Sequence, residues 1–177
     1  MVDDKKISKS IGNVYYLNEL AEQGFSPLDF KMWVLQGHYQ GTRNFTIEGL
    51  AAAKNRRLNW RNRIALLYQD NTDQHDEAAI DRIMDVLNDN LNSAEAFAII
   101  DNSILNLDDW KKIDELFGLN LVADSPDIDS DTRKLIAERA ESRKNRDFAR
   151  ADEIRDELAA QGIAVRDTDN GSIWEYI

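Results

Sequence analysis

Apolar residues recur every three or four positions through most of the chain, and this spacing predicts helices rather than strands. The first thirteen residues lack the pattern and are expected to form a loop. A short helix is predicted from Val14 to Ala21, with Gly24 after its end. A second helix is predicted to open at Pro27 and to end at Gly37.

The longest predicted helix begins after Thr46, a good N-cap residue, and its apolar positions continue to Leu67. Two or three further helices are expected over residues 76–107, and another over residues 108–117. Because the connections between these helices are short, residues 46–122 are predicted to form an antiparallel bundle.

The remaining sequence changes character twice. Residues 123–131 are acidic, contain the second of the two prolines and are interpreted as a linker. Beyond them we expect a helix over residues 132–144 and a second helix that Asp147 caps and Gly162 ends. Two apolar stretches then flank the pair Asn170-Gly171, which is typical of a β-hairpin turn.

The predicted fold is therefore mainly α, with one hairpin at the C-terminus. Its four parts are a loop and helical junction (1–45), an antiparallel helical bundle (46–122), a linker (123–132) and a small helical pair with the β-hairpin (133–177). No internal repeat divides the chain further.

Charge is distributed unevenly along the chain. The total is -11, but residues 1–68 carry ten lysines and arginines against six acids, and the rest carries twelve against twenty-seven. An acidic total opposes indiscriminate binding to nucleic acid, whereas a specific RNA site depends only on local positive charge. In the longest helix, Lys54, Arg56, Arg57, Arg61 and Arg63 suggest a basic exposed side, which a solvated face explains equally well.

Composition also narrows the chemistry. No apolar stretch reaches the length of a membrane-spanning helix, so we expect a cytoplasmic protein. The chain has no cysteine, and its two histidines, His38 and His75, are far apart in sequence. No disulfide and no metal site are therefore predicted.

The segment Lys6-Ile-Ser-Lys-Ser10 resembles the KMSKS signature of class I aminoacyl-tRNA synthetases, with isoleucine in place of methionine. The resemblance implies that Lys9 contacts ATP and that Lys6 assists it, since a flexible cationic loop stabilises charge that develops on pyrophosphate. Without that resemblance, the same residues describe only a solvated loop.

Two later segments resemble the cysteine-specific branch of that class, the cysteinyl-tRNA synthetases. Gly37-His38-Tyr39 and Asn44-Phe45-Thr46 occur in the family's order after the signature loop. We assign His38 no proton-transfer role and treat it as a family marker. The resemblance makes residues 1–45 the KMSKS loop and a junction that contacts the tRNA stem.

The C-terminal part resembles the family's anticodon-binding domain from Arg143 through the run that ends at Leu158, and on to Trp174. The anticodon-binding residues that the resemblance implies are Arg143, Phe148, Asp152 and Asp167. Readers of single-stranded RNA stack bases on aromatic or guanidinium planes and bond their edges with polar groups.

Several of these C-terminal side chains have an alternative interpretation. The family commonly has tryptophan where this chain has Phe148, which keeps stacking and loses the indole donor; its helical spacing also fits a core position. Trp174 is expected in the core. Arg143, Arg146 and Arg150 are expected near one helix face, for phosphate contact or for solubility alone.

The catalytic part of such an enzyme has no counterpart in this sequence. A class I synthetase needs a dinucleotide-type α/β domain, and the cysteine enzyme adds a zinc that selects the substrate thiol. We therefore predict no ligase activity for the isolated chain, whose parent enzyme uses ATP. The partners that the resemblance implies are cysteine tRNA and the missing N-terminal catalytic domain.

Three functions remain open on this basis. The first is the tRNA-binding C-terminal part of a cysteine-tRNA ligase. The second is a helical assembly or regulatory module without an RNA role, which the acidic downstream region suggests. The third is part of a cysteine ligase that acts on an amino sugar, because those enzymes share the loop signature; the resemblance to an anticodon domain counts against it.

Overall fold

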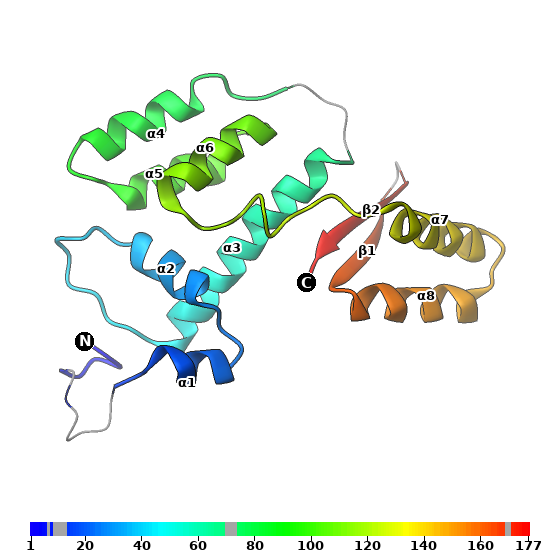
Figure 1. Ribbon diagram of the computed structural model, residues 1–177, viewed down its shortest axis with the longest axis horizontal. Helices are drawn as coiled ribbons and strands as arrows, with labels where there is room; N and C mark the ends of the chain where they lie inside the picture. Colours follow the sequence, from blue (N-terminus) through cyan, green and yellow to red (C-terminus); the bar gives the residue numbers. More distant parts are fainter. Residues whose placement is uncertain (7, 9–13, 70–73, 169–170) are drawn as a thin grey trace. The chain divides into compact units, whose positions relative to one another are not determined.

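The computed structural model describes residues 1–6, 8, 14–69, 74–168 and 171–177 (Figure 1). The helices are α1 (Leu17–Glu22), α2 (Pro27–Leu35), α3 (Ile47–Leu67), α4 (Ala79–Asn88), α5 (Ser93–Asn102), α6 (Leu107–Phe117), α7 (Ser130–Lys144) and α8 (Phe148–Ala160). The strands are β1 (Ile163–Thr168) and β2 (Gly171–Tyr176). The mainly α fold with a C-terminal hairpin is confirmed. None of the described helices is both long enough and apolar enough to cross a membrane.

Side-chain caps explain where several helices begin. The hydroxyl of Ser26 accepts a hydrogen bond from the amide of Asp29, whose carboxylate accepts one from the Ser26 amide, and Pro27 takes the first helical position. The Thr46 hydroxyl accepts from the Gly49 amide, as predicted for the start of α3. These contacts satisfy amide groups that the first turn of a helix leaves unpaired.

The chain divides into two compact units. Unit 1 comprises Met1–Asn59 with Asp73–Asn120, and unit 2 comprises Trp60–Thr72 with Leu121–Ile177. Helix α3 contributes residues to both. The four-part division predicted from the sequence stays a prediction.

Unit 1 holds α1, α2, the first part of α3, and α4 to α6. Its fully buried side chains include Met32, Leu50, Ile83, Ile100 and Ile113. Rings of α5 and α6 also pack edge to face, with centroids 5.0 Å apart between Phe97 and Phe117. The apolar helical positions of the sequence thus form the core of this unit.

The basic side of α3 is exposed only in part: Lys54 is exposed, whereas Arg57 is buried. Arg57 is buried, and its guanidinium donates to the carbonyl of Leu119 at 3.2 Å and lies 3.8 Å from the Asp29 carboxylate. Lys54 donates to the carbonyl of Gly24, and Arg56 pairs with Asp101. A loop carbonyl that folding removes from solvent needs a hydrogen-bond donor, and a long cationic side chain can reach it and donate.

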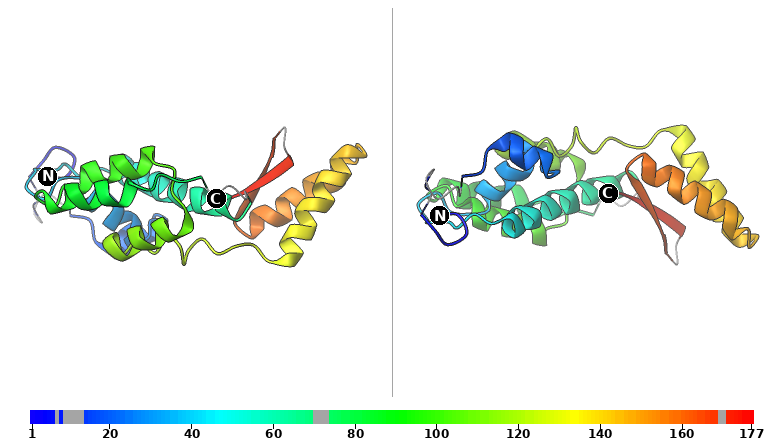
Figure 2. Two further views of the ribbon diagram at one scale, coloured as in Figure 1. Left: turned by 90° about the horizontal axis from the view of Figure 1, so that it is seen from above. Right: turned by 90° about the horizontal axis from the view of Figure 1, so that it is seen from below.

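Unit 2 is built around α7, α8 and the hairpin, whose arrangement is visible in Figure 2. Its core consists of Ala65, Ile136, Ile154, Leu158, Ile163 and Trp174. Trp174 is 2% exposed, which confirms its expected core position. The last part of α3 therefore packs with the C-terminal elements through Ala65.

The hairpin has an antiparallel register that runs from Ile163 opposite Tyr176 to Thr168 opposite Gly171. Residues 169 and 170 lie outside the described residues. Gly171 has a φ of 122°, a conformation open to glycine at little cost. The glycine of the predicted Asn-Gly pair is thus the first residue of β2.

Two side chains from the α3 region pair with the outer edge of β2. The Asn62 amide donates to the Tyr176 carbonyl at 3.1 Å and accepts from the Tyr176 amide at 2.7 Å. The Gln69 side-chain amide donates to the Trp174 carbonyl at 2.9 Å and accepts from the Trp174 amide at 2.8 Å. Side-chain amides thus replace a neighbouring strand, so the unpaired edge of β2 is covered.

We expect Asn62→Ala to loosen the hairpin. The substitution removes both hydrogen bonds to the Tyr176 backbone, and leaving such groups unpaired costs about 1–3 kcal/mol. Hydrogen exchange of the Tyr176 amide, followed by NMR, should accelerate accordingly. The matched control is Asn102→Ala, since the Asn102 amide donates only to the Ala98 carbonyl of its own helix. Unchanged exchange at Tyr176 in Asn62→Ala would contradict this assignment.

Candidate nucleic-acid interface

The turn between α7 and α8 brings two predicted site residues to one end of the helical pair. Helix α7 ends after Lys144, and the Asp147 amide donates to the Ser142 carbonyl while the Arg146 amide donates to the Arg143 carbonyl. This is the Schellman pattern, and Arg146 takes its left-handed position with a φ of 62°. Asp147 then caps α8 by accepting from the Arg150 amide. Arg143 in the last turn of α7 and the first residue of α8 therefore lie at the same end.

Asp167 on β1 lies in a cluster of four polar side chains from α7 and the hairpin. Its Oδ1 accepts from Arg139 Nη1 at 2.9 Å and from the Ser172 hydroxyl at 2.9 Å. Its Oδ2 accepts from Arg139 Nη2 at 3.2 Å and lies 3.0 Å from Arg143 Nε. Arg139 is buried, whereas 47% of the Arg143 side chain is exposed. The predicted residues Arg143 and Asp167 are thus in direct contact.

This environment favours the ionised form of Asp167. The hydrogen bonds from Arg139 hold the pKa of the Asp167 carboxyl below its ordinary value, although its partial burial acts in the opposite direction. The Ser172 hydrogen bond and the positive charges of Arg139 and Arg143 lower the pKa further. A carboxylate therefore persists here well into acidic solution.

Phe148 and Asp152 lie on α8. Phe148 is 57% exposed, so the core interpretation of this ring is wrong, and a base has access to it. Asp152 is exposed and pairs with Arg155 at 2.8 Å. Within the described part of the chain, no hydrogen bond or ion pair joins Phe148 or Asp152 to Asp167. Of the four predicted residues, Arg143 and Asp167 are thus in contact, and the turn between α7 and α8 places Phe148 at the same end of the helical pair as Arg143.

The expected common face of Arg143, Arg146 and Arg150 is wrong. The helix is interrupted between Lys144 and Phe148, so helical spacing does not carry across these positions. Arg150 is engaged with Glu138 at 2.8 Å and with Glu153 at 3.2 Å. Only Arg143 of the three contacts Asp167.

Sequence reasoning missed Arg139 and Ser172. Arg139 precedes Arg143 by one helical turn, so helical spacing alone places both guanidinium groups on one side of α7. Ser172 is the register partner of Asp167, which depends on the hairpin register. The spacing of Arg139 could have been noticed in the sequence, whereas the position of Ser172 could be found only from the strand pairing.

At the other end of the chain, the segment before the lysine-rich loop is held by one of the predicted family segments. The Met1 amine donates to the Arg43 carbonyl, and the Asp4 amide donates to the Asn44 side chain at 2.9 Å. The Phe45 amide and carbonyl bond the backbone of Met1 and Asp3. Lys6 is exposed. Lys9 lies outside the described residues.

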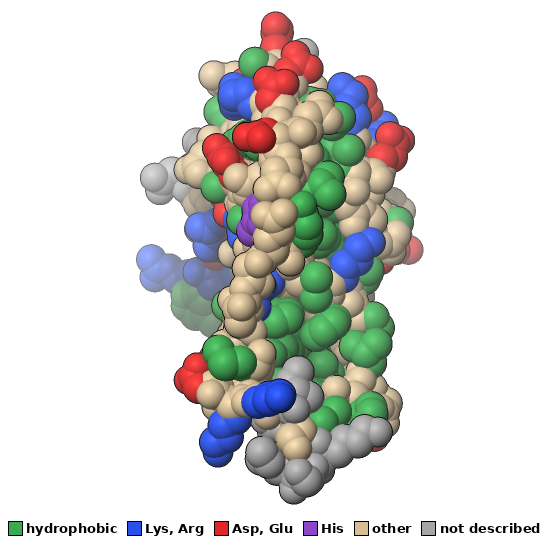
Figure 3. Space-filling model, turned by 90° about the vertical axis from the view of Figure 1, so that its left-hand side faces the viewer, with side chains coloured by type: hydrophobic (Ala, Val, Ile, Leu, Met, Phe, Trp, Pro, Cys, Tyr) green, Lys and Arg blue, Asp and Glu red, His purple; other side chains and the backbone are tan. Residues whose placement is uncertain are grey.

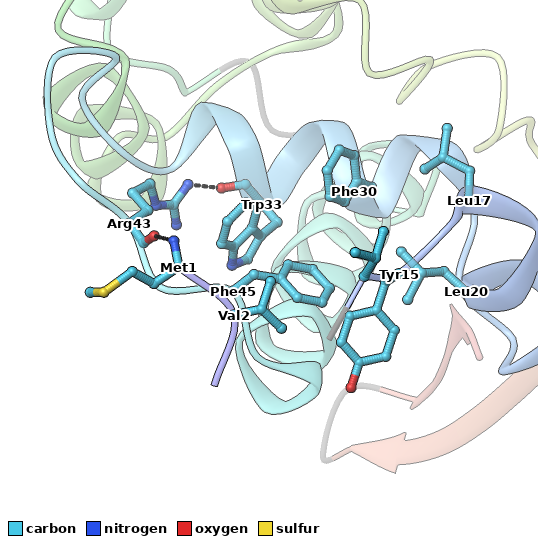
Figure 4. A pocket seen from close by; sticks show the side chains of 10 residues that line it. Met1, Val2, Tyr15, Leu17, Leu20, Phe30, Trp33, Arg43 and Phe45 are labelled. Atoms are coloured by element: carbon cyan, nitrogen blue, oxygen red, sulfur yellow. Dashed lines mark hydrogen bonds between the residues drawn. The ribbon is translucent and has the colours of Figure 1, made fainter. Parts of the chain in front are cut away.

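A pocket of about 350 Å³ opens beside this segment in unit 1 (Figure 4). Its lining is almost wholly apolar and comprises Met1, Val2, Val14, Tyr15, Leu17, Leu20, Phe30, Trp33, Arg43 and Phe45. The guanidinium of Arg43 stacks 4.2 Å from the Trp33 ring, and the Phe45 ring meets Trp33 edge to face at 5.0 Å. Leu17 is 54% exposed. Hydrophobic side chains also gather along the face shown in Figure 3.

The Gly-His-Tyr segment has a structural role in unit 1. The His38 and Tyr39 rings stack with centroids 4.9 Å apart, and the Tyr39 hydroxyl donates to Asn90 at 2.7 Å. These contacts join the loop after α2 to the turn between α4 and α5. In the described residues, no three His, Cys, Asp or Glu side chains are grouped so that they could hold a metal ion.

Comparison with known proteins assigns these features. Residues 125–174, which hold the helical pair and most of the hairpin of unit 2, match the model of a protein family, the cysteinyl-tRNA ligase anticodon binding domain. The residues that surround Asp167 all lie in this segment.

The chain is homologous to part of a cysteine–tRNA ligase. It is 32% identical to the cysteine–tRNA ligase of Solibacter usitatus over 99% of its length and 44% of that protein. The ligase of Brevibacillus brevis is 31% identical, with 98% and 44% covered, and that of Leptospira interrogans is 33% identical, with 98% and 43% covered. The resemblance predicted from the sequence is confirmed, and the chain spans less than half the length of these relatives.

The ion-pair cluster predicts a pH effect on stability. Because the folded-state pKa of Asp167 is lowered, its contribution to the free energy of unfolding is complete above the ordinary carboxyl pKa of about 3.9 and is lost as the pH falls below it. Asp167→Asn should therefore be less stable than the unaltered chain at pH 7, and the difference should shrink below about pH 4. Urea midpoints measured from pH 7 to pH 3 test this. A constant difference would contradict it.

Proposed function

We propose that this chain is the tRNA-binding part of a cysteine–tRNA ligase, which attaches cysteine to its tRNA at the expense of ATP in the cytoplasm. Its task in that enzyme is to recognise the anticodon of cysteine tRNA and to supply the KMSKS loop. The observation that supports this most directly is the Arg143–Asp167 pair, which lies 3.0 Å apart within the matched anticodon domain. The exposed Phe148 ring follows at the same end of the helical pair.

The cluster has the groups that reading of unpaired bases requires. Phe148 offers an exposed ring for stacking, and Arg143 offers guanidinium donors to acceptors on a base edge or to phosphate. Asp152 and Asp167 offer carboxylate acceptors for the amino and imino donors of bases. Local positive charge at Arg143 makes contact with RNA compatible with the acidic total of the chain.

The first part of unit 1 has a different role in this proposal. Lys6 and Lys9 would act on the pyrophosphate of ATP only once the N-terminal catalytic domain, which carries the α/β fold and the family's zinc, is supplied. The hydrogen bonds of Met1, Asp3 and Asp4 support this role, because they tie the residues before the loop to the body of unit 1. The apolar pocket beside them is the surface that this domain would cover.

Substitution of Phe148 tests base stacking. Because stacking of a base on an aromatic ring is worth about 1–3 kcal/mol, Phe148→Ala should weaken binding to cysteine tRNA by about fivefold to a hundredfold. Phe148→Trp should bind at least as well as the unaltered chain, since the ring remains and an indole donor is added. Titrations with the tRNA over a salt series measure both effects.

The control for stacking is Leu116→Ala, which removes another exposed apolar side chain, 40% exposed and far from Phe148 in sequence. Its affinity should stay unchanged. Equal affinity of the unaltered chain for cysteine tRNA and for the same tRNA with an altered anticodon would sink the proposed function.

Substitution in the apolar pocket tests the missing domain. We expect the N-terminal part of the Brevibacillus brevis ligase, purified separately, to bind this chain, and Leu17→Glu to reduce that affinity at least tenfold by placing a charge against an apolar surface. Calorimetric titration of the two purified proteins measures it. Ile104→Glu, at another exposed apolar side chain, is the control. Binding that both variants leave unchanged would remove the pocket from the interface.

The acidic downstream region still favours one other function. If the chain is an assembly module without an RNA role, it should show no binding to tRNA at any salt concentration and should bind a protein partner stably. The titrations above distinguish the two functions. A role in a cysteine ligase for an amino sugar has less support, because an anticodon domain serves no purpose there.

A further inference from the structure

Arg139 is a buried arginine in the middle of a helix, with a single carboxylate as its partner at the surface of unit 2. Its side chain is 7% exposed, and both terminal nitrogens donate to Asp167, at 2.9 and 3.2 Å. Such a two-point contact fixes the plane of the carboxylate as well as its position. The Asp167 side chain itself is 38% exposed.

Three hydrogen bonds occupy acceptor positions of Asp167, and Arg143 lies beside Oδ2. A carboxylate offers about four lone-pair sites, two on each oxygen. Arg139 takes one on each oxygen and the Ser172 hydroxyl takes the second on Oδ1, while Arg143 Nε lies 3.0 Å from Oδ2 as an ion-pair partner. An RNA donor can therefore bond Asp167 at the Oδ2 position beside Arg143, or by replacing one of the three hydrogen-bond donors.

The exposure of the two arginines decides which side of the Asp167 carboxylate RNA can reach. Removal of Arg139 from the carboxylate would leave a buried guanidinium without its partner, which is costly. Arg143 is the exposed arginine of the pair, and its Nε lies 3.0 Å from Oδ2. The outward acceptor position on Oδ2 is thus the one that RNA can reach.

We propose that Arg139 is a positioning residue for anticodon reading, which holds the Asp167 carboxylate from its buried side so that the Oδ2 position shared with Arg143 faces the RNA. This inference rests on the proposed function and goes beyond the four residues that the family resemblance implies. Arg139 itself touches no base. It removes rotational freedom from Asp167 before binding, so less entropy is lost when a base donor arrives.

The test compares two RNA probes on the full chain: a cysteine tRNA anticodon stem-loop and the same stem-loop with one anticodon base changed. Arg139→Gln should reduce the ratio of the two affinities about tenfold, because the carboxylate is no longer held in one orientation. Arg139→Lys should fall in between, since it keeps the charge and loses the two-point contact. Circular dichroism and hydrogen exchange at Trp174 report whether unit 2 stays folded.

The matched control is Arg133→Gln on the same helix, which breaks the exposed pair between Arg133 and Asp127. This control should leave the ratio of the two RNA affinities unchanged.

A pH series adds a second readout of the Asp167 environment. Arg139 and Arg143 from α7 are the charged groups that contact Asp167, whereas Arg166, the strand neighbour of Asp167, pairs with Glu175 instead. As the pH falls from 7 toward 4, the ratio in Arg139→Gln should begin to fall at a higher pH than in the unaltered chain, because the Asp167 carboxyl loses the donor that lowers its pKa most.

The possible outcomes separate this inference from the proposed function. Failure of the unaltered chain to distinguish the probes would overturn both. If the unaltered chain distinguishes them and the folded Arg139→Gln and Arg139→Lys variants do so equally well, the positioning role is wrong. An equal loss of affinity for both probes would also overturn it, because that is the effect of a lost charge alone.

Discussion

The pairing of two side-chain amides with the edge of β2 is the interaction on which the C-terminal unit depends. A two-stranded hairpin is at best marginally stable in water by itself. Here Asn62 and Gln69 bond the backbone at Tyr176 and Trp174, and the indole of Trp174 is buried against the helices. These contacts fix β2, and the register then fixes β1 and Asp167. The position of the carboxylate is thus a consequence of contacts made far from it in sequence.

The use of arginine in this protein differs between its helices. In α3, Arg57 donates to the carbonyl of Leu119 and Arg61 to that of Asp124. Both hydrogen bonds stabilise the segment between α6 and α7. In α7, Arg139 and Arg143 converge on one carboxylate. The richest basic segment of the sequence therefore has internal partners, whereas in α7 a buried and an exposed arginine share one carboxylate.

Much of the fold follows from local rules. The start at Pro27, the caps at Thr46 and Asp147 and the stop at Gly162 were evident because a helix end needs particular side chains and backbone angles. The hairpin followed from apolar stretches on both sides of a turn-forming pair. The common face of Arg143, Arg146 and Arg150 was wrong, because a left-handed residue between two helices ends the periodicity.

The sequence by itself determined the helical class, the terminal hairpin and the family, since periodicity, caps and motif order are properties of neighbouring residues. It also pointed to Arg143 and Asp167 through resemblance. Only the tertiary structure decided that these two meet, that Arg139 and Ser172 complete the cluster, and that Phe148 is exposed. The physical reason is that burial and ion pairing depend on which elements pack together, and residues distant in the sequence settle that.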